Sequence, residues 1–66
     1  MKLDKIIQKV QENDLDNPLR AGVEKQAVLN ELKEMNDREV SIQEISKYLK
    51  NRFNRKDAET LEKYCK

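Results

Sequence analysis

The residues of this chain with the most distinctive chemistry form a basic segment close to its C-terminus. Five lysines and arginines, and no acidic residue, occur between Ser46 and Lys56. Lysine, arginine and asparagine side chains bind phosphate oxygens, and aromatic rings among them stack on bases. The candidate residues for binding a partner or nucleic acid are Lys47, Tyr48, Lys50, Asn51, Arg52, Asn54, Arg55 and Lys56.

The elements expected around this segment resemble a helix-turn-helix over residues 41–65. A helix capped at Ser41 is followed by a short polar turn at residues 50–52 and by a second helix from Asn54. In DNA-binding proteins of this design the second helix enters the major groove. The side chains then expected to face bases or phosphates are Asn54, Arg55, Lys56 and Glu59.

Two features argue against nucleic acid as the main ligand. The second helix also carries Asp57, Glu59 and Glu62, whose carboxylates repel phosphate. The chain as a whole has a net charge of +1, which produces no strong field around the molecule. The alternative explanation is a locally basic surface, balanced by glutamate-rich neighbours, that promotes solubility or contacts an acidic protein.

The residue types disfavour catalysis and metal binding. The chain has no histidine, which is the commonest general base and metal ligand. Cys65 therefore has no histidine to activate it, and we expect it to pack as a small apolar residue on the last helical turn. Asp14 and Asp16 begin like a calcium-binding loop, but Pro18 and Leu19 stand where that loop requires an oxygen ligand and a glycine. We expect no enzyme activity, cofactor, metal or small-molecule substrate.

Length and composition predict a single small helical domain over residues 1–66. Charged residues make up 41% of the chain, which has one glycine and one proline. This composition is typical of an all-α protein, and the periodic apolar residues disfavour the alternative of a disordered chain. A core of this size supplies only about 3–5 kcal/mol, so we expect a protein partner or self-association to add stability.

The cysteine count and the apolar runs favour a cytoplasmic protein. A single cysteine allows no intramolecular disulfide, which is usual in a reducing compartment. No apolar run approaches the roughly 18 residues of a membrane span, and the start of the chain does not resemble a signal peptide. Met1 is the start expected of a complete chain.

Apolar residues at helical spacing predict two helices in the first half of the chain. The stripe of the first helix, over residues 2–12, consists of Leu3, Ile6, Ile7 and Val10. Asn17 before Pro18 predicts the cap and first residue of a second helix, over residues 18–35. The stripe of this helix consists of Ala21, Val28, Leu32 and Met35. We expect it to continue through Gly22, and the alternative is a helix that begins after this glycine.

The second half of the chain has the clearest helix start. Ser41 and Glu44 have the spacing of a capping box, in which each side chain bonds the other residue's backbone N–H. Val40 and Ile45 flank this cap and are placed to form a hydrophobic staple. We expect a third helix over residues 42–52.

A fourth helix is predicted from Asn54 onward. Asn54 is a favourable cap, and Asp57 lies in the first turn, where a negative charge suits the helix dipole. The alternative is one long rod, in which the third and fourth helices fuse through Phe53.

The predicted fold is all-α: a small bundle of three to four short helices, the last two in a helix-turn-helix-like arrangement. The predicted core consists of Leu3, Ile6, Ile7, Val10, Val28, Leu32, Met35, Ile42, Ile45, Leu49, Phe53 and Leu61. We predict a non-enzymatic binding or regulatory protein that acts through protein–protein contact with a partner or with itself. The alternative is a nucleic-acid-binding module that uses residues 41–65.

Overall fold

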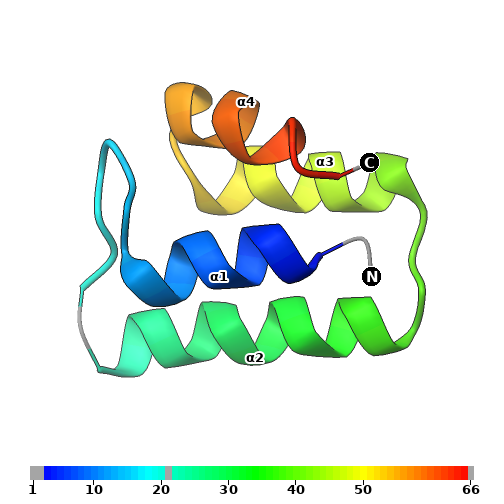
Figure 1. Cartoon of the computed structure of the whole chain (residues 1–66), viewed down its shortest axis with the longest axis horizontal. Helices are drawn as coiled ribbons and strands as arrows, with labels where there is room; N and C mark the ends of the chain where they lie inside the picture. The colour runs from blue at the N-terminus through cyan, green and yellow to red at the C-terminus, as the bar shows by residue number, and fades with distance from the viewer. Residues whose placement is uncertain (1–2, 21, 66) are drawn as a thin grey trace.

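The computed structural model describes residues 3–20 and 22–65, which form a small all-α bundle without strands (Figure 1). Its helices are α1 (Asp4–Glu12), α2 (Val23–Asp37), α3 (Ile42–Arg52) and α4 (Arg55–Glu62). The bundle measures 27 × 21 × 18 Å. The predicted fold class is therefore confirmed.

The helices associate in two antiparallel pairs. Figure 1 shows α1 alongside α2 and α3 alongside α4, and these are the closest helix pairings. Apolar side chains from all four helices meet in one core between the pairs. The seam between α2 and α3, which belong to different pairs, is therefore the natural place for a groove.

The first helix ends at an asparagine that also shapes the loop after it. Asn13 adopts the left-handed conformation, with φ of 54°, which is common just beyond a helix C-terminus. Its side-chain amide donates to the Leu19 carbonyl at 3.1 Å and accepts from the Leu19 backbone N–H at 3.0 Å. This double contact folds the loop back and buries Leu19 against the core. The predicted helix start at Lys2 lies outside the described residues.

The prediction that the second helix begins at Pro18 and continues through Gly22 is wrong. Gly22 has φ of 89° and ψ of −123°, a conformation open almost only to glycine, and α2 begins at the next residue. Pro18 belongs to the loop. The predicted cap residue Asn17 starts no helix there, and its backbone N–H donates to the carboxylate of Asp57. Ala21, which was predicted to belong to the stripe of this helix, lies outside the described residues.

Both predicted cap residues in the second half act as caps, but among the described residues the capping box at Ser41 has only one of its two bonds, because the Glu44 side chain accepts none from the Ser41 N–H. The Ser41 hydroxyl accepts from the Glu44 backbone N–H at 3.2 Å, and the Asn54 side chain accepts from the Asp57 N–H at 2.8 Å. Phe53 separates the two helices with an extended backbone, φ −120° and ψ 163°. The single fused rod is therefore excluded.

The core agrees with the prediction at most positions and differs at two. Ile42 is 52% exposed, and Ile7 is only partly buried. Ile42 is the first residue of α3. The last residue of α4, Glu62, contacts α3 at Ser46, which is one turn after Ile42. The buried apolar residues absent from the predicted core are Leu19, Leu29, Ala58 and Cys65.

Candidate functional site

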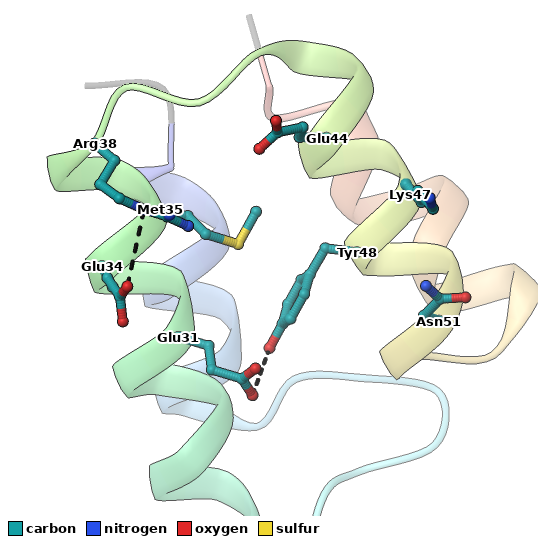
Figure 2. Close-up of a pocket in the computed structure, with 8 residues that line it drawn as sticks. All are labelled: Glu31, Glu34, Met35, Arg38, Glu44, Lys47, Tyr48 and Asn51. Atoms are coloured by element: carbon teal, nitrogen blue, oxygen red, sulfur yellow. Dashed lines mark hydrogen bonds and ion pairs between the residues drawn. The ribbon is translucent and has the colours of Figure 1, made fainter.

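A groove of about 380 Å³, open to solvent, lies along the seam between α2 and α3 (Figure 2). Helix α1 lies behind the groove in this view. The groove therefore opens on the side of the bundle that faces away from α1. The residues that line the groove are Glu31, Glu34, Met35, Arg38, Glu44, Lys47, Tyr48 and Asn51.

The apolar part of the groove comes from one side chain on each helix. Met35 extends from α2 toward α3, and the Tyr48 ring extends from α3 toward α2 (Figure 2). Met35 is buried and Tyr48 is partly buried against the core. A flexible thioether beside an aromatic ring forms an adaptable apolar contact surface.

One end of the groove is closed by a polar network across the seam. The Tyr48 hydroxyl donates to the Glu31 carboxylate at 3.2 Å, and the Arg52 guanidinium binds the same carboxylate oxygen at 2.8 Å. Burial raises the pKa of the Tyr48 phenol above its ordinary 10.0, against the opposing effect of Arg52. The hydroxyl therefore remains a donor at neutral pH, and Glu31 holds α2 and α3 in register.

The charges along the groove divide into paired and unpaired groups. Glu31 binds Arg52, and Glu34 lies 3.8 Å from Arg38, the residue directly after α2. In the part of the chain that the structure describes, the side chains of Glu44 and Lys47 make no hydrogen bond or ion pair. The groove thus presents one free anion and one free cation, both on α3.

The structure divides the eight predicted binding residues over different surfaces. Lys47, Tyr48 and Asn51 line the groove, and Arg52 closes its end. Lys47 and Asn51 also border a shallow surface on the outer side of α3, together with Lys50 and the exposed Ile42.

The remaining predicted residues have acidic partners or a capping role. Arg55 binds Glu59 at 3.2 Å, Lys56 binds Asp16 at 3.2 Å, and Lys50 lies 4.0 Å from Glu62. Asn54 uses its side-chain oxygen as the cap of α4. In the described part of the chain, every cation of the basic segment except Lys47 therefore has a carboxylate oxygen within 4.0 Å.

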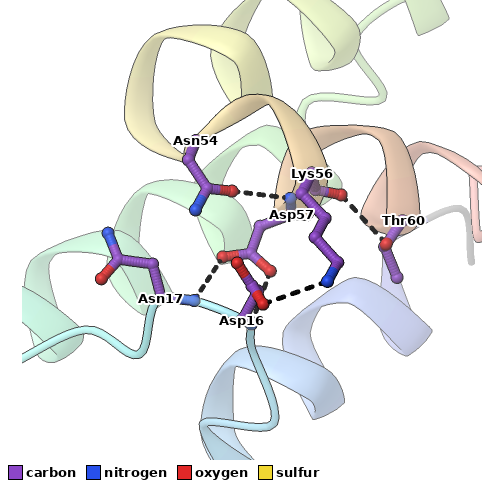
Figure 3. A network of polar contacts seen from close by, with 6 residues as sticks. All are labelled: Asp16, Asn17, Asn54, Lys56, Asp57 and Thr60. Atoms are coloured by element: carbon purple, nitrogen blue, oxygen red, sulfur yellow. Dashed lines mark hydrogen bonds and ion pairs between the residues drawn. The ribbon is translucent and has the colours of Figure 1, made fainter.

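The carboxylate of Asp57 does more than interact with the helix dipole, which is the only role that the sequence predicted for it (Figure 3). Asp57 is 3% exposed and accepts from the backbone N–H groups of Asp16 at 2.7 Å and Asn17 at 2.9 Å. It thereby fastens the loop between α1 and α2 to the start of α4. The contact spans forty residues of sequence, so no local pattern reveals it.

Cys65, Asp14 and Asp16, whose residue types would suit catalysis or metal binding, do not line the groove. Cys65 packs as a buried apolar residue, as predicted, but it lies beyond the end of α4 and not on its last turn, and burial raises the pKa of its thiol. Residues 3–20 and 22–65 contain no group of side chains arranged to hold a metal ion. None of the helices in this part of the chain is long and apolar enough to cross a membrane.

A second surface of a different character lies on the outer side of α2. It is formed by uncharged residues, and its Val23 is 88% exposed. The residues around it are Gly22, Gln26, Ala27 and Asn30. It carries no charged group that would orient a ligand, so the groove remains the candidate site.

Comparisons with known proteins add no family to this description. No protein-family model, curated protein or solved structure matches the chain.

Proposed function

We propose that this chain is a non-enzymatic binding module that acts through protein–protein contact at the α2–α3 groove. The observation that supports this most directly is the composition of the groove. The apolar parts of Met35 and Tyr48 line the groove together with two charges, Glu44 and Lys47, for which the described part of the chain supplies no ion-pair partner.

The groove has the layout of a small protein-recognition site. Tyr48 is a residue type enriched at interface hot spots, and its ring is held by the contact of its hydroxyl with Glu31. A fixed ring costs a partner little ordering energy on binding. The aliphatic part of a partner side chain contacts the ring and Met35, while Glu44 and Lys47 select its orientation by charge.

Such a protein acts by occupying its partner, as a small cytoplasmic regulator or adaptor does. The absence of histidine and the burial of Cys65 support a role without catalysis. The single cysteine supports a reducing compartment.

A photo-crosslinking amino acid tests the groove in the full chain, expressed in its own cell. We place it at Asn51, which is exposed on the groove wall, and in a matched control at Lys5, which is exposed on α1. A binding groove gives a discrete protein adduct from position 51 and none from position 5. Equal adducts from both positions, or no adduct from position 51, would contradict the proposal.

Nucleic-acid binding through the helix-turn-helix-like segment at residues 41–65 is the second candidate function. It is supported by the exposure of Lys47, Lys50, Arg55 and Lys56 on α3 and α4. It is weakened by the carboxylates that pair with three of these four cations.

A titration against duplex DNA and single-stranded RNA separates the two functions. Phosphate-driven binding falls steeply between about 50 and 200 mM salt. Reversing the charge of Lys47, Arg52, Arg55 and Lys56 abolishes such binding if this segment is the site. No binding at low salt eliminates the second function.

A further inference from the structure

The free charges of the groove have a spacing that limits what can pair with them. Glu44 and Lys47 are three residues apart on α3, less than one turn, and lie on its outward side. Residues at this spacing are neighbours on a helix surface. A partner helix must therefore present a cation opposite Glu44 and an anion opposite Lys47, about one turn apart.

The α3 helix itself satisfies this requirement when it runs in the opposite direction. In a two-fold arrangement of antiparallel α3 helices, Glu44 meets Lys47 of the second copy, and Lys47 meets Glu44 of the second copy. A parallel arrangement in register places like charges together. The charge pattern is thus self-complementary in one orientation only, which is the requirement for an isologous dimer.

The rest of the groove is compatible with the same register. In this register Gln43, which is exposed, lies beside Tyr48 of the second copy. Among its described residues, the groove has no other unpaired charge that would meet a charge of the same sign on the second copy. The cations and anions on either side, at Glu31, Glu34 and Arg38, are already paired within each chain.

We propose that the partner of the α2–α3 groove is a second copy of this chain, docked through antiparallel α3 helices with reciprocal Glu44–Lys47 ion pairs. The inference rests on the proposed function, because it names the occupant of the same groove. The small size of the domain is consistent with it, since a 66-residue chain gains stability by association.

Charge-reversal variants test the pairing directly. Glu44→Lys gives a chain with lysines at both positions, and Lys47→Glu gives a chain with glutamates at both. Each variant brings like charges together twice in a homodimer, so its dissociation constant rises roughly 10- to 100-fold. A mixture of the two variants restores opposite charges at both contacts and forms a heterodimer. The double variant Glu44→Lys/Lys47→Glu restores the homodimer.

The measurement is sedimentation equilibrium of the full chain and each variant over a range of concentrations and salt. The matched controls are Lys5→Glu and Glu12→Lys, which make the same changes on exposed positions of α1. We expect the controls to dimerise like the parent chain, with all dimers weakening as salt rises. Far-ultraviolet circular dichroism verifies that each variant is folded, and Lys47→Glu, at an exposed mid-helix position, tests the pairing even if Glu44→Lys does not fold.

Three results would overturn the inference. One is a parent chain that is monomeric at about 1 mM, a concentration at which even weak dimers form. Another is a dimer unaffected by either reversal. The third is folded single variants that do not associate when mixed. A monomer that still gives a crosslink from Asn51 to a different protein refutes this inference and leaves the proposed function intact.

Discussion

Replacing Asp57 by asparagine should destabilise the fold more than any change to an exposed charge. The carboxylate is 3% exposed and holds the Asp16 and Asn17 N–H groups at 2.7 and 2.9 Å. An amide has one oxygen and one NH₂ group, so Asp57→Asn keeps at most one of these bonds and directs a donor at the other N–H.

The size of the effect follows from these two bonds. A hydrogen bond to a charged group contributes about 1.5–3 kcal/mol, and the lost anion at the helix N-terminus adds about 0.3–1 kcal/mol. Water reaches the exposed loop in the variant and recovers part of this. We therefore expect a loss of about 2 kcal/mol, or roughly 8–16 °C in Tm for a chain of this size.

Thermal and urea unfolding measure the loss, and amide hydrogen exchange shows where it originates. The exchange of the Asp16 and Asn17 N–H groups should accelerate in the variant beyond the global change. The matched control is Lys56→Ala, which removes the exposed ion pair from Lys56 to Asp16 and should cost less than about 1 kcal/mol. If Asp57→Asn costs no more than Lys56→Ala, the loop is not held by this carboxylate and the reasoning fails.

Further predictions concern the core, the backbone and the buried thiol. Ile45→Ala should lower the free energy of unfolding, measured in urea, by about 2–5 kcal/mol, because it removes a fully buried side chain. Ser41→Ala should lower it by about 1 kcal/mol, because it removes a helix cap. Equal losses in the two variants would contradict this ranking. Gly22→Ala should lower the free energy of unfolding by about 1–2 kcal/mol, because alanine is strained at a φ of 89°. Glu39→Gly should raise it by about 0.5–1 kcal/mol, because glycine relieves the strain of a side chain at a φ of 53°. A change of the same sign in both variants would refute this explanation. Burial raises the pKa of Cys65 above its ordinary 9.0, so the unfolded chain loses this proton first. The free energy of unfolding should therefore fall as pH rises above about 9, and Cys65→Ala should show a smaller fall; identical pH profiles would exclude the thiol as a cause.

The parts of the fold that were predicted correctly are those set by short-range geometry. The caps at Ser41 and Asn54 and the bounds of α3 depend on bonds between residues three positions apart. The apolar stripe of α1 depends only on the spacing of its apolar residues at the helical period. Neighbouring residues carry all the information that such features require.

The errors occurred where distant contacts decide the outcome. Pro18 lies in a loop that the side chains of Asn13 and Asp57 hold by hydrogen bonds, and Ile42 lies exposed one turn before Ser46, the α3 residue that contacts the last residue of α4. Helical period cannot report either fact, since it says which residues share a face and not how far the covering helix extends.

The candidate site shows the same division. The sequence by itself determined that the chain is helical and that five cations lie close together between Ser46 and Lys56. The placement of Lys47, Tyr48 and Asn51 on the wall of one groove came from the tertiary structure. Only the tertiary structure decided which charges remain free. Ion pairs form between side chains brought together by packing, so Arg52 is paired by Glu31 of α2 and Lys56 by Asp16 of the loop, while Glu44 and Lys47 are left without partners in the described part of the chain.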